Sequence, residues 1–250
     1  MLSGKWLFGL LFCLIFSQLH AQKVRLSRKV KGEEFDIIRE SLLLPHPRKL
    51  HTIKAAFIIQ KFKFPEPWLE GDYHVPFLNV QATMGLKHNF SAELKVGTIV
   101  VSNQASAGFR WHYRISPKFF FNTGYDASVV YGALNQLTQQ GFNTRVYAFI
   151  HSPNISVGYV YKDIAFTLRS EVHVVGHVKI RAGENVISDD KNFYNGFSVG
   201  LFMEQRLWKN NVIIMGLRNN YQKFSYIAWP AFSSFNRFYN IPEISVGLVL

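Results

Sequence analysis

The sequence predicts an all-β chain that forms a closed antiparallel β-barrel and spans a membrane. Three observations predict this fold. Apolar and polar residues alternate from Leu78 to Lys87 and along many later segments, so each strand would carry one apolar face. Residues 1–21 have the pattern of a cleaved signal peptide. No long apolar run follows them that could form a membrane-spanning helix, so strands would make the crossings.

The signal peptide has its three usual parts. Lys5 supplies the positive charge, Trp6 to Phe16 is apolar, and Ala21 is the small residue before the expected cleavage site. A short membrane anchor is the alternative, but a spanning helix needs roughly 20 apolar residues. Cys13 would be removed with the signal, which excludes disulfides, thiolate metal sites and cysteine nucleophiles from the mature chain.

Composition agrees with a membrane barrel. Aromatic residues make up 16% of the chain, and barrels place aromatic girdles at both membrane interfaces. The formal net charge of +12 could also indicate a nucleic-acid partner. For an exported chain we expect instead that the basic groups lie near anionic lipid headgroups, and we expect no nucleic-acid partner.

Residues 22–50 are expected to form a periplasmic N-terminal arm before a barrel of residues 51–250. Five basic residues open the arm, and residues 33–44 could form a short helix that ends at Pro45. Two interpretations stay open for this arm. It is either a partly ordered lead-in, or a plug or docking arm.

The expected strands follow in order along the chain. Tight turns are expected at residues 88–89, 116–118, 162–163 and 208–211, and proline suits the second of these because it fixes φ. Loops are expected at residues 65–75, 132–144, 176–191 and 226–242. The strands between them would be residues 51–62, 77–87, 90–101, 105–115, 119–130, 145–161, 164–175, 193–205, 212–225 and 243–250.

Residues 145–161 decide the strand number. Pro153 could divide them into two strands, but single-chain bacterial barrels have even strand numbers and short turns on the periplasmic side. Counting back from Leu250, the tight turns share one side only if residues 145–161 make a single crossing. This gives about ten strands, within a range of about eight to twelve.

The turns and the closing strand carry a family resemblance. Ala21-Gln22, Ser116-Pro117-Lys118, Tyr161-Lys162-Asp163-Ile164 and the alternating segment from Ile244 to Leu250 resemble the small outer-membrane β-barrels of Gram-negative bacteria, in the style of the Bacteroidetes. The resemblance covers residues 51–250 and is architectural. It implies a location in the cell outer membrane with lipid as a partner. Leu250 departs from the aromatic residue that ends many members.

A β-sheet that spans a membrane must close into a barrel, because lipid offers its backbone no hydrogen-bond partners. In lipid an open sheet edge would leave backbone N–H and C=O groups without partners, so the strands must close on themselves. The soluble alternative is a secreted lipocalin-like barrel, whose apolar face surrounds a ligand. Against that alternative, the polar faces of the expected strands are rich in charge.

The inward faces of the strands would bring charges of both signs into one lumen. A ten-stranded barrel is far narrower than a porin, so we expect these charges to pair and to close or constrict it. A narrow selective pore is the alternative. The inward residues of this lumen charge network are Glu93, Lys95, Arg110, His112, Arg114, Asp126, Arg169, Glu171, His173 and Glu204.

The candidates for catalysis and metal binding are few. Glu171 and His173 share a strand face and resemble half of a catalytic triad, but no nucleophile occupies an adjacent position. Ser152 follows His151, in a segment that reads as a turn or bulge. The spacing of His173 and His177 does not suit a helical metal site, so we expect no metal and no cofactor.

The loop at residues 226–242 is unusually rich in aromatic rings. It would form a lid over the barrel mouth, a partner-binding surface, or part of the interface girdle. The rings are Trp229, Phe232, Phe235, Phe238 and Tyr239.

The sequence therefore favours a non-enzymatic outer-membrane barrel that serves binding, assembly or narrow, selective transport. A protein partner would bind at the loop 226–242 or at the N-terminal arm. Three alternatives stay open: an accessory subunit of a secretion or surface-assembly machine, a lipid-modifying barrel enzyme, and the secreted lipocalin-like barrel.

Overall fold

The computed structural model describes residues 35–63, 74–99, 101–135, 143–208, 211–225, 229 and 237–250. The expected signal peptide, the basic residues 23–31 and the rings of Phe232 and Phe235 lie outside the described residues. Residues 35–250 form one compact unit.

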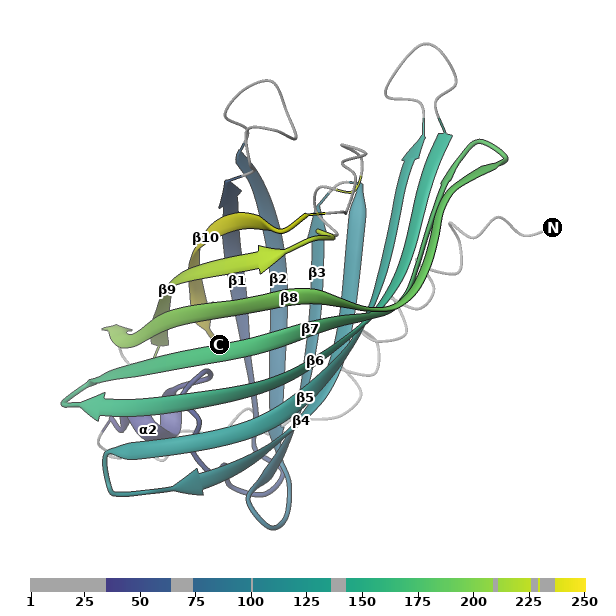
Figure 1. Ribbon diagram of the computed structural model, residues 1–250. Coiled ribbons are helices and arrows are strands. Elements are labelled where there is room, and N and C mark those ends of the chain that lie inside the picture. Colours follow the sequence, from purple (N-terminus) through teal and green to yellow (C-terminus); the bar gives the residue numbers. More distant parts are fainter. Residues whose placement is uncertain are drawn as a thin grey trace, which may run out of the picture. The chain divides into compact units, whose positions relative to one another are not determined.

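Ten antiparallel strands form a closed barrel in which neighbours in sequence are neighbours in space (Figure 1). Closure is made between the first and last strands, where Ile59 pairs with Val246. The predicted fold class is confirmed, and residues 145–161 make a single crossing. The strands are β1 (Ile53–Lys63), β2 (His74–Gly85), β3 (Phe90–Ile99), β4 (Ser102–Arg114), β5 (Phe119–Asn135), β6 (Asn143–Tyr161), β7 (Ile164–Ala182), β8 (Asn185–Trp208), β9 (Asn211–Gln222) and β10 (Tyr239–Val249).

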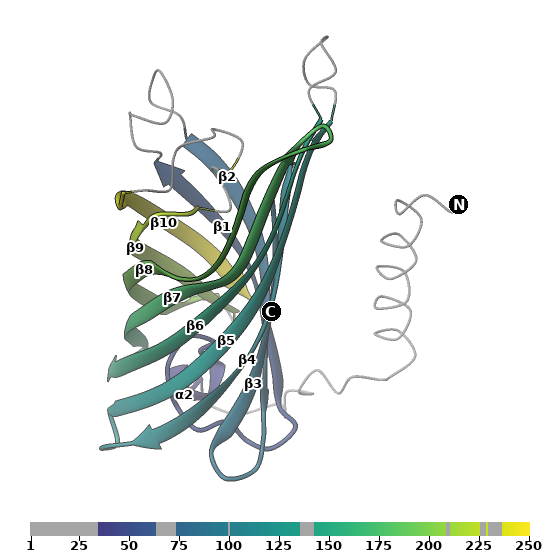
Figure 2. The same ribbon diagram turned by 45° about the vertical axis from the view of Figure 1, so that its right-hand side comes forward.

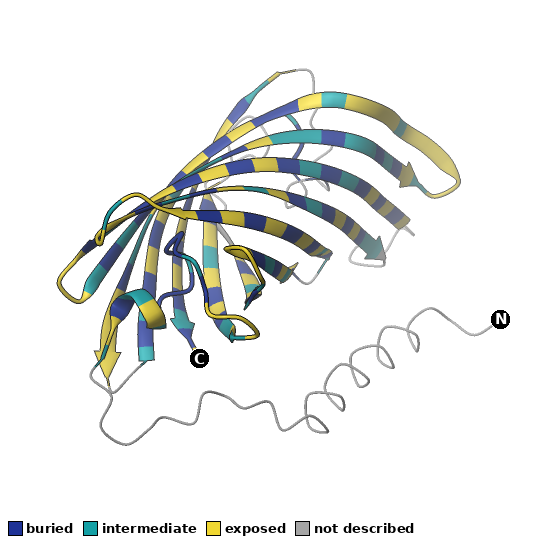
Figure 3. Ribbon diagram, turned by 90° about the horizontal axis from the view of Figure 1, so that it is seen from below, coloured by how far each residue is buried: buried dark blue, intermediate teal, exposed yellow. Residues whose placement is uncertain are grey.

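The predicted alternation sets which face of each strand looks inward. Burial alternates along the strands, as the banding in Figure 3 shows. On β3, Leu94 is 60% exposed whereas its neighbour Glu93 is 5% exposed. In the middle of the barrel wall, apolar side chains such as Leu94 therefore face outward and polar ones such as Glu93 face the lumen, which is the reverse of a lipocalin-like barrel.

The loop predicted at residues 176–191 is wrong. β7 and β8 continue through it as a hairpin that turns at Gly183, whose φ of +61° suits glycine. A β-bulge between His173 and Val174 shifts the register, and beyond it the outward positions of β7 are basic instead of apolar while β8 is mostly polar, so the apolar outward face of the other strands is lost there. The hairpin extends beyond the shorter strands β9 and β10 (Figure 2).

Two other predicted loops are shorter than expected. β5 ends at Asn135 and β6 begins at Asn143, which narrows the loop predicted at residues 132–144. β10 begins at Tyr239, four residues before the predicted start at Glu243, because Tyr239 already pairs with Gln222 of β9. The last residues of the loop 226–242 therefore belong to the barrel wall.

Before β1 the chain forms the short helix α2 (Ile37–Glu40) and then lies inside the barrel. The helix is much shorter than the predicted 33–44, and its N-cap Asp36 accepts a hydrogen bond from the N–H of Ile38. Leu42 and Leu44 are buried against lumen residues of the strand ends. We call residues 35–50 the plug segment, the end of the barrel that holds it the plugged end, and the opposite end the loop end.

Among the described residues, no helix has the length and apolarity needed to cross a membrane. In the same part of the chain no three side chains of the metal-binding kind come together.

Candidate functional site: the lumen of the barrel

Glu204 of β8 anchors the plug segment. Its carboxylate accepts hydrogen bonds from three successive backbone N–H groups, at 2.5 Å from Leu42, 3.1 Å from Leu43 and 2.9 Å from Leu44. Such a run of N–H groups binds an anion well, because all of them point at one charge. Because these amides bond to Glu204, they cannot continue α2, which explains why the helix ends at Glu40.

Further contacts hold the plug segment in place. The guanidinium of Arg48 donates to the carbonyls of Ser41 and Leu42, at 3.1 and 2.5 Å, and so closes the segment on itself. Lys54 of β1 pairs with Glu40 at 2.8 Å. On β6, a Cβ atom at Gly158 would lie only 2.5 Å from Pro45, so glycine makes room for the segment against the wall.

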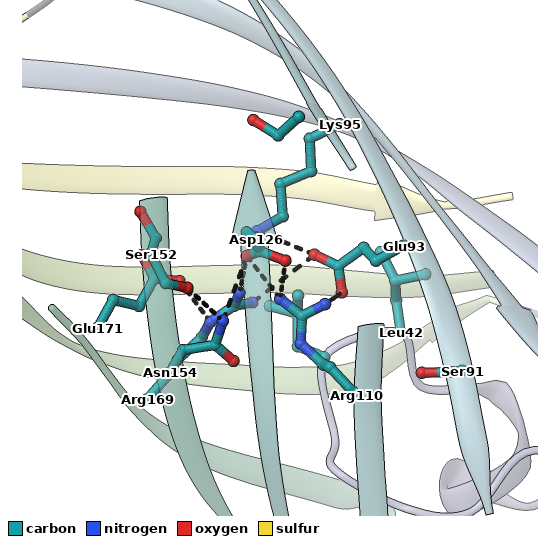
Figure 4. A network of polar contacts seen from close by, with 12 residues as sticks. Leu42, Ser91, Glu93, Lys95, Arg110, Asp126, Ser152, Asn154, Arg169 and Glu171 are labelled. Carbon is teal, nitrogen blue, oxygen red and sulfur yellow. Dashed lines mark hydrogen bonds and ion pairs between the residues drawn. The ribbon is translucent and has the colours of Figure 1, made fainter. Parts of the chain in front are cut away.

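Above the plug segment, seven charged side chains form what we call the ionic layer (Figure 4). Asp126 lies at its centre. Its carboxylate forms ion pairs with Lys95 at 3.3 Å, Arg110 at 2.9 Å and Arg169 at 3.1 Å. Arg110 also pairs with Glu93, and Glu171 pairs with Arg169 at 2.6 Å and with Arg218. The members come from β3, β4, β5, β7 and β9: Glu93, Lys95, Arg110, Asp126, Arg169, Glu171 and Arg218.

One ion pair of this layer crosses the lumen directly. Glu93 on β3 lies 3.8 Å from Arg169 on β7. These strands are four positions apart in a barrel of ten, so their side chains approach each other from nearly opposite walls. The ionic layer therefore runs across the interior as well as along its wall.

The ionic layer divides the lumen into two cavities. On the plugged side a cavity of about 10 Å³, enough for about one water molecule, lies against Leu43, Arg48 and Glu93. On the other side is a polar chamber of about 100 Å³ that reaches Lys95, Glu171 and Arg218. Amide and hydroxyl side chains line much of this chamber, among them Gln60, Asn79, Gln104, Ser128, Asn220 and Gln222.

Beyond the chamber, the described residues form an apolar layer at the loop end. Trp229, one of the predicted loop rings, is fully buried there among Val130, Val146 and Phe224. Phe238 lies elsewhere, stacked on Tyr221 of β9 with ring centroids 5.1 Å apart. Tyr239 is buried in β10. The predicted ring cluster is thus divided, as far as it is described, between the lumen and the wall.

Six of the ten predicted lumen residues meet in the ionic layer, and four lie outside it. His112 shares a hydrogen bond with Ser91 at 2.7 Å, and Glu204 binds the plug segment. Arg114 is exposed at the end of β4, where its guanidinium lies over the ring of Phe120. β4 ends at Arg114, so this side chain lies at the rim of the barrel and not inside the lumen, although it is on the inward face of the strand.

Sequence reasoning missed Arg218, which lies on the inward face of β9. It bonds to Glu171 and, at 2.6 Å, to the hydroxyl of Ser198. The alternation along β9 could have identified it. Arg218 shares a strand face with Gly216 and Asn220, and this face is opposite the apolar one that carries Leu217. Glu243 of β10 was also missed. It is buried and accepts a hydrogen bond from Gln60 at 2.6 Å.

The weak catalytic candidates do not form a triad. His173 lies between two hydroxyls, 3.0 Å from Ser152 and 3.1 Å from Ser198. Glu171 bonds to Arg169 and Arg218, so no carboxylate among the described residues orients the imidazole. In a Ser-His-Asp triad the histidine is held by such a carboxylate.

The sequence matches no protein-family model and no curated protein. Among solved structures it is similar to neisserial surface protein A, with 13% identity over 79% of this chain and 96% of that one and a TM-score of 0.34. The KdgM porin with disordered oligogalacturonate is 10% identical over 78% of this chain and 97% of its own, with a TM-score of 0.38.

The outer membrane protease OmpT from Escherichia coli is 11% identical over 79% of this chain and 95% of its own, with a TM-score of 0.45. The three names cover a surface protein, a porin and a protease, and likeness at this level transfers no role. The evidence for a closed barrel is the pairing of its ten strands, and not these similarities.

Proposed function

We propose that this protein is an outer-membrane barrel that binds a small polar solute in its chamber and does not act as an open diffusion pore. The ion pair between Glu93 and Arg169 carries the proposal, because it joins nearly opposite walls. The plug segment adds a second obstruction at the plugged end. The outward apolar faces support the membrane location, because lipid is the solvent in which that arrangement is favourable.

The chamber supports the ligand class. Asn79, Gln104 and Gln222 line it and make no side-chain hydrogen bond to another described residue. Amides can both donate and accept hydrogen bonds, so they suit hydroxyl groups of an uncharged solute. Since the chamber measures about 100 Å³, which is room for roughly seven to ten water molecules, the solute would be a small polyol or a monosaccharide.

Conductance across a planar lipid bilayer tests the closed lumen. We expect the purified wild-type barrel to give no discrete current steps. The double substitution Glu93→Gln and Asp126→Asn removes two carboxylates and leaves Lys95, Arg110 and Arg169 to repel one another. This variant should give steps that favour anions.

Asp190→Asn is the matched control, because Asp190 is exposed on β8 at the loop end. It should leave the bilayer silent. Discrete steps from the wild-type protein would overturn the closed lumen. A double variant that folds and stays silent would overturn the role of the ionic layer in closing it.

A further inference from the structure

The outward face of the wall carries a dense group of basic residues at the loop end of β6, β7 and β8. Their lumen-facing neighbours Val146, Val178 and Ile180 are buried, so these basic side chains point away from the lumen. We call them the basic cluster: Arg145, His177, Lys179, Arg181 and Lys191.

The strand register places two arginines directly opposite each other. Arg145 of β6 pairs with Arg181 of β7, and next to them Lys191 of β8 lies opposite His177 of β7. Directly opposite residues on one face have Cβ atoms about 5 Å apart, and like charges in such positions destabilise a sheet. An anion between them would remove this cost.

The described residues supply only one carboxylate to the basic cluster. Asp189 pairs with His177 at 2.8 Å and with Lys179 at 3.1 Å. Asp190 lies on the alternate face and accepts a hydrogen bond from Ser188. Within the described ranges no carboxylate pairs with Arg145, Arg181 or Lys191, and all three are exposed.

The position of the basic cluster on β6 points to its ligand. The outward face of this strand runs from Tyr159 through Ile155 to Phe149 and Tyr147. An apolar band about 25 Å high needs about ten residues of a tilted strand, which is the spacing from Tyr159 to Phe149. Arg145 follows Tyr147 on the same face, so it lies at the level of lipid headgroups.

We propose that the basic cluster binds the phosphate of an anionic lipid in the leaflet at the loop end. Arginine suits this ligand because its guanidinium can donate two parallel hydrogen bonds to one phosphate. A lipid is favoured over a soluble anion because the aromatic face of Tyr147 and Phe149 continues directly into the cluster and can contact acyl chains. The inference rests on the membrane location proposed above.

Competition between two lipids tests the proposal. The folded protein is equilibrated in neutral detergent with equal amounts of phosphatidylglycerol and phosphatidylcholine, and the lipids it retains are counted by native mass spectrometry. Wild-type protein should prefer phosphatidylglycerol. The double substitution Arg145→Gln and Arg181→Gln should lower this preference about tenfold, since each basic group at a membrane surface contributes substantially.

The matched control replaces two exposed lysines near turns of the plugged end, Lys87→Gln and Lys118→Gln. This pair should keep the wild-type preference. Equal preference in wild-type protein and the Arg145/Arg181 variant would overturn the lipid site, and so would an equal loss in the lysine control. If the double variant does not fold, Arg181→Gln alone takes its place.

Two further arms separate the alternatives. Inorganic phosphate added in excess should not displace phosphatidylglycerol, and full displacement would show a soluble-anion site instead. Insertion into pure phosphatidylcholine vesicles tests the membrane location by itself. Protein that inserts into these vesicles but shows no preference for phosphatidylglycerol would overturn only the lipid site. Protein that inserts neither into phosphatidylcholine vesicles nor into phosphatidylglycerol vesicles would overturn the membrane location.

Discussion

At the scale of single residues, Glu204 shows how one lumen carboxylate takes a role that its neighbours do not share. Glu93 and Asp126 face arginine side chains, but Glu204 faces the backbone of the plug segment. All three lie on inward faces of strands, so the alternation alone treats them alike. Their different partners follow from the level of the barrel at which each one lies.

Replacing Glu204 should loosen the plug segment. Glu204→Gln removes the negative charge that three N–H groups bind, and charge-assisted hydrogen bonds of this kind are worth about 2 kcal/mol. Amide hydrogen exchange at residues 42–44 should become about 30-fold faster. Glu184→Gln, in the exposed turn between β7 and β8, should leave the exchange unchanged. An unchanged rate in the Glu204 variant would show that the apolar contacts suffice.

At the scale of elements, the plug segment combines apolar packing with a titratable group. His46 is buried, its Nδ1 lies 3.2 Å from the carbonyl of Leu44, and its ring meets that of Phe120 edge to face. Burial holds the pKa of His46 well below 6.5, and the positive charge of Arg48 lowers this pKa further. His112 and Lys54 also face the imidazole and disfavour its charged form.

Docking of the plug segment should therefore weaken in acid. The pKa of His46 is lower in the docked segment than in the undocked one, so the undocked state binds the extra proton as the pH falls below 6.5. Docking loses up to about 1.4 kcal/mol for each pH unit below that value, until the docked pKa is reached.

Hydrogen exchange of residues 41–48, corrected for the intrinsic effect of pH, measures this loss. Protection should be full above pH 6.5 and fall below it. His46→Gln should flatten the profile. The same acid sensitivity in that variant would contradict the assignment to His46.

At the scale of the whole molecule, the barrel reverses the arrangement of a soluble protein. Leu217 on β9 is 63% exposed and pairs with Ile244 and Leu201, which are more than half exposed as well. The charged groups of the ionic layer are enclosed instead. In water this arrangement would expose a continuous apolar wall, whereas in lipid it is stable.

A charge on the lipid-facing wall should cost stability according to its depth. Leu217→Lys lies in the middle of β9 and should lower the free energy of unfolding by about 2–4 kcal/mol, the cost of lysine near the bilayer midplane. Leu250→Lys lies beyond the end of β10 and should cost about 0–1 kcal/mol. Unfolding by guanidinium chloride in phospholipid vesicles measures both. Equal costs would show that β9 does not face lipid.

The local pattern determined the strand faces, the strand number and the inward register of the charges. The pattern determines these features because successive side chains of a strand point to opposite sides of the sheet, so each residue's face follows from its position in the sequence. The pattern failed at residues 176–191, where a bulge shifts the register and basic or polar residues replace the apolar ones on the outward face, although the backbone pairing continues.

What the sequence by itself determined is the kind of wall this protein builds and the charges that it turns inward. Only the tertiary structure decided which of those charges meet. Glu93 reaches Arg169, and Glu204 binds amides 160 to 162 residues away, because closure and strand tilt bring distant positions to one level of the lumen. Alternation specifies on which side of the sheet a side chain lies but not its position along the barrel axis. That position decides which partner the side chain meets.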